Sequence, residues 1–173
     1  MVYELCSPLD GLIEITQGIN GPFSHGPFRK SADYTNSIDI KVMPDENIYA
    51  PISGKLHRIF EEQDKYSRSL KFKKGMLGNF LEIRLIDGSI LHLQHLARYF
   101  ATDLRLKIDD FLSQGDLIGK TGRSGWIGPM DHLHMMIYRR KGLKLMTLPF
   151  SLQGCKSLEH TYEMTAKLLG TNY

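Results

Sequence analysis

Apolar and polar residues alternate in several short segments of the chain, and this pattern predicts β-strands. In a strand, successive side chains point to opposite faces, so alternation buries one face and leaves the other polar. Gly, Pro, Asn and Asp separate these segments, as is typical of turns between strands. We therefore expect strands at 37–42, 47–51, 54–60, 80–85, 89–95, 116–121 and 132–138.

Turns are better defined than helices in this sequence. Asp87-Gly88 lies between two alternating segments and predicts a tight hairpin. A helical pattern is confined to 96–104 and 158–169. Because strands and helices do not alternate regularly, parallel βαβ units are not expected. The sequence therefore predicts a mainly β fold, an antiparallel sheet or sandwich with long loops and a little helix.

Composition narrows the class of protein. The chain has 173 residues, of which 42% are hydrophobic and 24% charged, which suits one ordinary globular domain. No apolar run reaches the roughly 18 residues of a membrane-spanning helix. A net charge of +3 is too small to predict a nucleic-acid partner. Two basic groups are either solvated or contacts for an anionic polymer: the expected surface loop 61–75, and the cluster of Arg139, Arg140, Lys141 and Lys144.

The first 24 residues lack the pattern of a secretory leader, since they contain three acidic residues and no Lys or Arg. Two interpretations remain: a cytoplasmic protein, or a mature form from which a leader was removed. Cys6 and Cys155 are the two cysteines. They either pair in an oxidising compartment or are unrelated free thiols.

His132-Leu133-His134 is the strongest local signal for a site. Side chains two residues apart on a strand share a face, so both imidazoles can reach one centre while Leu133 points to the core. A polar pair on a solvent-facing strand is the alternative interpretation.

His92 and His95 form a second signal. Strict alternation places them on opposite faces, so only one is expected at a site shared with the first pair. His95 is the candidate because it lies where the strand meets a loop, and His92 is expected to pack or face solvent.

His25 and Asp39 complete the candidate chemistry. His25 lies in a loop rich in Gly, Pro and Ser, and Asp39 lies between Ile38 and Ile40 on an expected strand. Asp39 therefore faces either water or a polar site. Catalytic zinc uses three nitrogen, oxygen or sulfur ligands and keeps one position for water. Two histidines and one carboxylate fit that requirement.

Several stretches, in this order, resemble one family. They are Ser-Ile-Asp-Ile at 37–40 with Ile-Tyr-Ala-Pro-Ile-Ser-Gly-Lys-Leu at 48–56, Gly-Asn-Phe-Leu-Glu-Ile at 78–83, Gln-His-Leu at 94–96, and Gln-Gly-Asp-Leu-Ile-Gly-Lys-Thr-Gly at 114–122 followed by His-Leu-His at 132–134. The set is similar to the M23 peptidases, the lysostaphin or LytM type of zinc endopeptidase that acts on bacterial peptidoglycan.

The resemblance implies roles for individual residues. Asp39 and His134 would be zinc ligands, and His132 and His95 would be catalytic. The common family pattern places the remaining ligand where this chain has Thr35, which cannot serve as an imidazole ligand. Another family pattern, Q-G-x-x-G-x-x-S-H, is similar to 17–25 and implies that His25 is the third ligand.

The resemblance also implies the LytM fold, a duplicated hybrid motif, as a single domain over 1–173 with a core at about 17–140 and a C-terminal extension at 141–173. Asn79, in the 78–83 stretch, and Trp126 are candidate substrate-binding residues. Trp126 stands in a loop longer than the family's usual one, and a buried core tryptophan is the competing interpretation.

The implied function is a zinc-dependent metalloendopeptidase that binds one zinc ion and hydrolyses peptidoglycan stem peptides or cross-bridges. It would act in the bacterial cell envelope, in the periplasm or secreted. Two alternatives stay open: a metal-free LytM-like binding or activator module of cell-wall hydrolases, and a zinc peptidase that acts on a non-wall peptide.

Overall fold

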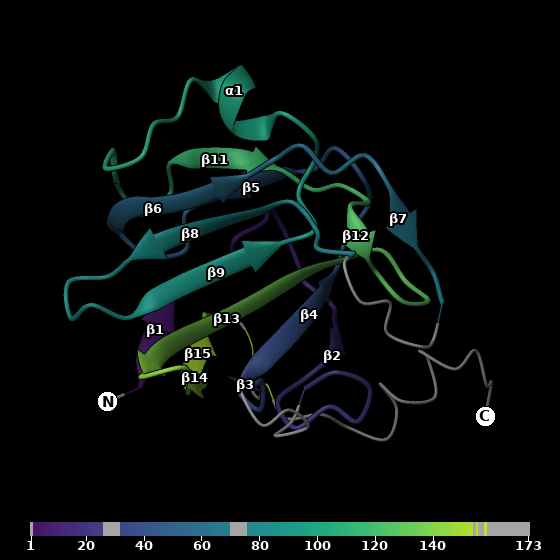
Figure 1. Cartoon of the computed structure of the whole chain (residues 1–173), viewed down its shortest axis with the longest axis horizontal. Coiled ribbons are helices and arrows are strands. Elements are labelled where there is room, and N and C mark those ends of the chain that lie inside the picture. Colours follow the sequence, from purple (N-terminus) through teal and green to yellow (C-terminus); the bar gives the residue numbers. More distant parts are fainter. Residues whose placement is uncertain (1, 26–31, 70–75, 154, 156–157, 159–173) are drawn as a thin grey trace.

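Most of the strands expected from alternation belong to one large twisted sheet, while those expected at 47–51 and 116–121 pair with each other in a separate two-stranded sheet (Figure 1). The computed structural model describes residues 2–25, 32–69, 76–153, 155 and 158. Its elements are β1 (Tyr3–Leu5), β2 (Ile15–Gln17), β3 (Ala32–Asp33), β4 (Ser37–Lys41), β5 (Asn47–Tyr49), β6 (Gly54–Phe60), β7 (Tyr66–Ser67), β8 (Phe80–Arg84), β9 (Ile90–Gln94), α1 (Phe100–Leu104), β10 (Phe111–Leu112), β11 (Leu117–Lys120), β12 (Gly125–Trp126), β13 (His132–Lys141), β14 (Lys144–Leu148) and β15 (Phe150–Leu152).

Strand β13 organises the sheet because it pairs with three neighbours. Along one edge, β4 pairs antiparallel with the first half of β13, and β14 pairs antiparallel with the second half. Along the other edge, β13 pairs antiparallel with β9, and the sheet continues through β8 and β6 to β10. Its ten residues make this strand long enough to carry both halves.

One face of the sheet is the hydrophobic core. Leu133, Met135 and Ile137 of β13 are fully buried there, as the alternation predicted. The core also takes side chains from β1, β5, β11, β15 and α1, among them Leu5, Ile48, Ile118, Leu152 and Phe100. Because the core occupies this face, the residues between the core residues on β13 point to the opposite face.

Most predicted elements are confirmed, with shifts of one or a few residues at their ends. The hairpin at Asp87-Gly88 is present, with Gly88 at a φ of 80°. The helix expected within 96–104 is only α1, and β13 continues to Lys141, three residues beyond the prediction. The segment 61–75 contains the short β7; its residues 70–75, and the helix expected at 158–169 beyond residue 158, lie outside the described residues.

The predicted C-terminal extension is part of the sheet system where it is described. Strand β14 pairs with β13, and β15 pairs in parallel with β1 from the other end of the chain. Cys6 and Cys155 are both free thiols. Among the described residues, no helix has the length and apolar character needed to cross a bilayer.

Candidate functional site

Three potential metal ligands from different parts of the chain meet on the sheet face opposite the core. They are His25 in the loop after β2, Asp39 in the middle of β4 and His134 near the start of β13, with one donor atom each, all within 4.8 Å of one another. Asp39 Oδ1 lies 2.8 Å from His134 Nδ1 and 3.2 Å from His25 Nε2. The structure therefore brings together the three residues expected to share an ion.

Strand register explains how two of the three converge. Asp39 and His134 are directly opposite each other on the antiparallel pair β4 and β13. Directly opposite side chains lie about 5 Å apart on the same face of a sheet, so the backbone alone sets their proximity. Gln17, at the end of β2, pairs with Asp39 on the other edge of β4, and the loop that carries His25 leaves from that point.

The His25 ring is held with one nitrogen facing the centre. His25 is 1% exposed, and its Nδ1 lies 3.0 Å from the carbonyl oxygen of Gly18. In the neutral tautomer Nδ1–H donates to that carbonyl, which leaves the Nε2 lone pair for the centre. Nε2 is buried, lies 3.2 Å from Asp39 Oδ1 and makes no hydrogen bond to any described residue. A buried nitrogen that faces a carboxylate without a hydrogen bond calls for an explanation, and a bound cation between His25, Asp39 and His134 supplies one.

Gln17 is a site residue that sequence reasoning placed in a motif without giving it a role. Its side-chain Nε2 donates to Asp39 Oδ2 at 2.7 Å and to Ser24 Oγ at 2.7 Å, while its Oε1 accepts from the Phe23 backbone N–H. A Cβ at Gly21 would lie 2.3 Å from Gln17 Cγ, which explains the second glycine of the motif. Gln17 thus orients the Asp39 carboxylate and also shapes the loop that carries His25.

Electrostatics of the centre suit a cation. Burial alone would raise the pKa of Asp39, but the surrounding imidazoles, His132 and His25 first, outweigh burial and hold this pKa well below its usual range. Burial lowers the pKa of His134 to about 4, although Asp39 acts against this. At neutral pH the cluster therefore offers a carboxylate and a neutral imidazole, the protonation states that bind metal. The same carboxylate raises the pKa of His25 against the effect of burial.

His132 and His95 lie side by side next to the three donors. Their ring centroids are 4.6 Å apart, and His132 Nε2 lies 3.6 Å from Asp39 Oδ1. His132 Nδ1 is 2.9 Å from the Met130 carbonyl oxygen, and His95 Nδ1 is 2.8 Å from the Ser124 carbonyl oxygen. Donation from each Nδ1–H leaves Nε2 as the atom that can exchange a proton. Burial first, and then His132, lower the pKa of His95 well below its usual range.

The expectation that His92 and His95 face opposite sides was wrong. The two rings lie 6.4 Å and 6.5 Å from the His134 ring, respectively. His95 follows the last residue of β9 and has a φ of 71°, a left-handed conformation that breaks the alternation of the strand. Such a conformation in a non-glycine residue carries strain and is typical of functional sites.

Asn79 belongs to the scaffold behind the site. It is fully buried, its Nδ2 donates to the carbonyl oxygens of Gln63, Leu96 and Ala97, and its backbone N–H donates to Ser124 Oγ. It therefore has no exposed surface to offer a substrate, and its backbone N–H holds the side chain of Ser124, the residue whose carbonyl oxygen faces His95. Gly78 is required next to it, because a Cβ there would lie 2.7 Å from His95 Nδ1.

Trp126 is half-buried at the end of β12, where its Nε1 donates to the Ser69 carbonyl oxygen. Its contact with substrate stays a prediction. His57 lies away from the cluster, beside Arg84. His160 lies outside the described residues.

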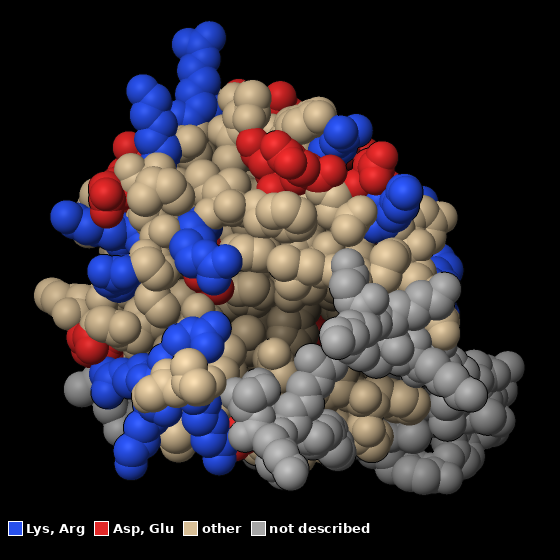
Figure 2. Space-filling view, viewed as in Figure 1, with Lys and Arg blue, Asp and Glu red and all other residues tan. Residues whose placement is uncertain are grey.

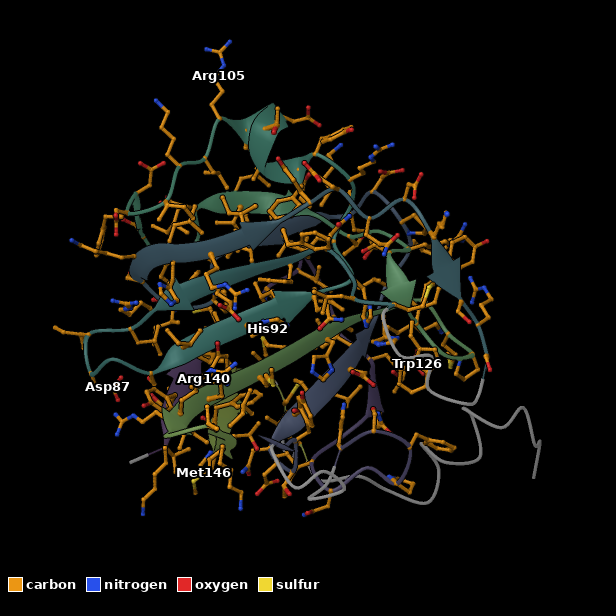
Figure 3. The ribbon with its side chains drawn as sticks, in the orientation of Figure 1. Asp87, His92, Arg105, Trp126, Arg140 and Met146 are labelled. Carbon is orange, nitrogen blue, oxygen red and sulfur yellow. The ribbon has the colours of Figure 1, made fainter. Side chains whose placement is uncertain are left out.

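His92 is part of a buried polar network on the same sheet face (Figure 3). Its Nδ1 lies 3.1 Å from Glu82 Oε1, and its Nε2 lies 3.0 Å from Gln94 Oε1. Glu82 also accepts a hydrogen bond from the Tyr138 hydroxyl at 3.0 Å and pairs with Arg58 at 3.5 Å. Burial alone would raise the pKa of Glu82, but the His92 and Tyr138 hydrogen bonds lower it below its ordinary value.

This network predicts a pH-dependent stability. A carboxylate with a lowered folded-state pKa stabilises the fold above its unfolded-state pKa, and this contribution is lost as the pH falls through the folded-state pKa. We expect Glu82→Gln to lower the free energy of unfolding by about 1–3 kcal/mol at pH 7. The difference from wild type should shrink below about pH 4, where Glu82 protonates in the unfolded chain. Urea unfolding of the wild type and of Glu82→Gln, at pH 7 and again below about pH 4, measures this difference.

Glu62→Gln is the matched control, because Glu62 is exposed. It should leave the free energy of unfolding within about 0.5 kcal/mol of wild type. A Glu82→Gln effect that stays constant down to pH 3 would contradict the assignment of the stabilisation to the ionised carboxylate.

Comparisons with known proteins bear on the family and the fold of the chain. The model of Peptidase family M23 matches residues 33–145. LytU is 24% identical to this chain with a TM-score of 0.54, and the match covers 79% of this chain and 82% of LytU. The catalytic domain of the prophage-encoded M23 protein EnpA from Enterococcus faecalis is 19% identical with a TM-score of 0.54, over 83% of this chain and 93% of its own. A zinc-containing peptidase from Vibrio cholerae is 21% identical with a TM-score of 0.53, over 81% of this chain.

These solved structures show that the chain shares their fold. The chain spans only 37% of the Vibrio cholerae peptidase and 44% of a peptidase M23 structure from Pseudomonas aeruginosa. A comparison with curated proteins finds no match.

Proposed function

The chain belongs to peptidase family M23, and we propose that it is a zinc-dependent endopeptidase that hydrolyses peptide bonds in peptidoglycan stem peptides or cross-bridges. The observation that carries the zinc is the buried Nε2 of His25, which makes no hydrogen bond to a described residue and faces Asp39 and His134. The peptidoglycan substrate is the one that membership of this peptidase family suggests. The cell envelope, in the periplasm or outside the cell, is the location that suits this substrate.

His25 Nε2, Asp39 Oδ1 and His134 Nδ1 would hold the ion. When bound, zinc polarises a peptide carbonyl and makes a water acidic enough to attack it at neutral pH. This leaves the chain's own residues with the tasks of fixing donors, orienting water and moving protons.

We assign proton movement to His132 and His95. Their Nδ1 atoms face backbone carbonyls, so Nε2 is the exchanging atom of each ring. A ring in this position can accept a proton from the attacking water, donate to the oxygen on which charge develops, and later pass a proton to the leaving amine. Because His95 is fully buried and its pKa is low, it suits the neutral donor or acceptor; His132, which is slightly more exposed, suits the shuttle.

Zinc content and wall digestion test the proposed function together. Protein purified without added metal should take up one zinc ion per chain in a titration followed by elemental analysis. The zinc-loaded protein should release muropeptides from purified sacculi, and a chelator should stop the release until zinc is restored.

Other outcomes separate the alternatives. Binding to sacculi without zinc uptake or muropeptide release would indicate a metal-free binding module. Zinc uptake with cleavage of a soluble peptide and intact sacculi would indicate a peptidase for a non-wall substrate. Either result would overturn the proposed function.

A further inference from the structure

A second, basic pocket lies on the same sheet face as the candidate site. Its cavity of about 370 Å³ is lined by four arginines, Arg58, Arg84, Arg139 and Arg140, together with His57 and Tyr138. Figure 3 places His92 near the middle of the sheet and Arg140 and Asp87 toward its left end. Figure 2 shows Lys and Arg gathered over that end, beside a hollow near the centre of this face.

Strand register gives the separation between the pocket and the candidate site. His134, Gln94 and Phe80 form one row across β13, β9 and β8; Tyr138, Ile90 and Arg84 form another. Four residues along β13 separate the two rows, which is about 13 Å at about 3.3 Å per residue. An extended peptide of about four residues spans the same length. One peptide can therefore occupy both places.

The row between them contains Met136, His92 and Glu82. Glu82 accepts hydrogen bonds in its network and pairs with Arg58 at 3.5 Å. Its charge is therefore already engaged, and it fixes Arg58 at the edge of the pocket.

Charge in the pocket is only partly compensated. Arg139 pairs with Asp87 at 2.6 Å, as Arg58 does with Glu82. Within the described part of the chain, Arg84 and Arg140 have no carboxylate within ion-pair distance. The pocket therefore carries two guanidinium charges beyond its two carboxylates.

His57 does not reduce this excess. Arg84 Nη2 lies 2.8 Å from His57 Nδ1. Burial, and then the Arg84 guanidinium, lower the pKa of His57, so its ring is neutral at neutral pH and accepts a hydrogen bond from Arg84. Accepting that bond steadies the Arg84 side chain and leaves its charge available.

We propose that this pocket binds a carboxylate of an acidic peptide substrate, about four residues from the bond that is cleaved. The inference rests on the proposed function. A planar guanidinium matches the two oxygens of a carboxylate and donates charge-assisted hydrogen bonds to them. Phosphate shares this chemistry, but the 13 Å separation favours a group on the same peptide. The pocket thus selects the substrate class, and the zinc site acts on it.

Paired peptides test the proposal. Each pair differs only by Glu or Gln, placed three, four or five residues from the cleaved bond on either side. We expect the wild-type, zinc-loaded protein to cleave one Glu peptide with a kcat/KM about tenfold above that of its Gln partner, in line with one or two charge-assisted bonds. The double variant Arg84→Gln/Arg140→Gln should bring this ratio close to one, and added salt should reduce it in wild type.

Arg105→Gln is the matched control, since Arg105 is exposed and projects from the top of the molecule beside α1, away from Arg140 and Asp87 (Figure 3). It should keep both the activity and the tenfold ratio. Thermal unfolding of each variant shows whether the fold is intact. If the double variant unfolds early, the single variants Arg84→Gln and Arg140→Gln take its place, and each should reduce the ratio.

Binding to the metal-free protein separates failure of this proposal from failure of the proposed function. By calorimetry, the Glu peptide should bind more tightly than the Gln peptide to wild type and equally to the double variant. Equal cleavage and equal binding of every pair would overturn the carboxylate pocket and leave the peptidase intact. Binding of inorganic phosphate without any difference between the peptides would overturn it as well. No cleavage of any peptide or sacculus would instead refute the proposed function, while the binding measurement still decides on the pocket.

Discussion

Asp39→Ala is expected to abolish zinc binding and peptide hydrolysis together. Asp39 Oδ1 lies between the nitrogen donors of His25 and His134, so its removal takes away the only anionic donor of the three. Loss of a residue that merely supports a ligand typically weakens metal binding by about 10–100-fold, so loss of the ligand should exceed about 100-fold. Zinc titration and muropeptide release, measured on the same preparation, check both effects.

Three further variants make this result specific. Asp39→Asn keeps the volume and removes the charge, and it should also lose zinc. Gln17→Ala removes the hydrogen bond to Asp39 Oδ2 and should weaken zinc binding by about 10–100-fold. Asp116→Asn, at an exposed loop carboxylate, should bind zinc and hydrolyse as wild type does. An Asp39→Ala protein that is folded by circular dichroism and still holds zinc tightly would show that Asp39 is not a ligand.

The sequence predicted the strands of the site because alternation reports burial directly. Ile38 and Ile40 point into the core, which turns Asp39 to the other face, and the same rule places His132 and His134. Their meeting depends on the pairing of β4 with β13, which joins residues 95 positions apart. Register between distant strands leaves no local pattern, so the convergence could be inferred only from the resemblance to the family.

Two details of the site escaped sequence reasoning for physical reasons: the backbone angle that brings His95 to the same side as His92, and the hydrogen-bonding roles of Gln17 and Asn79. His95 faces the site through a left-handed φ just beyond its strand, and no alternation pattern encodes a single backbone angle. Gln17 and Asn79 act through several hydrogen bonds each, and a polar residue in a sequence does not reveal whether it will be buried. The signal for both was the neighbouring glycine, Gly21 or Gly78, whose missing Cβ makes room for a packed side chain or ring.

The sequence indicated only two of the four arginines of the basic pocket. Arg139 and Arg140 stood out as part of a charged run at the end of an expected strand. Arg58 and Arg84 did not, because neither belongs to a run of charged residues. The pairing of β6 with β8, and of β8 with β9, gathers them with the run at the end of β13.

His132→Ala is expected to remove turnover and leave zinc in place. His132 Nε2 lies 3.6 Å from Asp39 Oδ1, outside the set of three donors, while its Nδ1 is held by the Met130 carbonyl. A positioned acid or base contributes about 10²–10⁴-fold to the rate, so kcat should fall by that factor. Zinc content per chain should stay at the wild-type value. Steady-state kinetics on a soluble peptide, with zinc measured on the same sample, provide the two numbers.

His92→Gln separates a catalytic from a structural role, because His92 is another buried histidine on this face, 6.4 Å from the His134 ring. His92 makes its hydrogen bonds to Glu82 and Gln94 rather than to the centre. Its loss should therefore lower the free energy of unfolding by about 1–3 kcal/mol and change kcat far less than His132→Ala does. If His132→Ala keeps full turnover, or if it releases zinc as Asp39→Ala does, then proton transfer must be assigned elsewhere, and His95 becomes the residue that performs it.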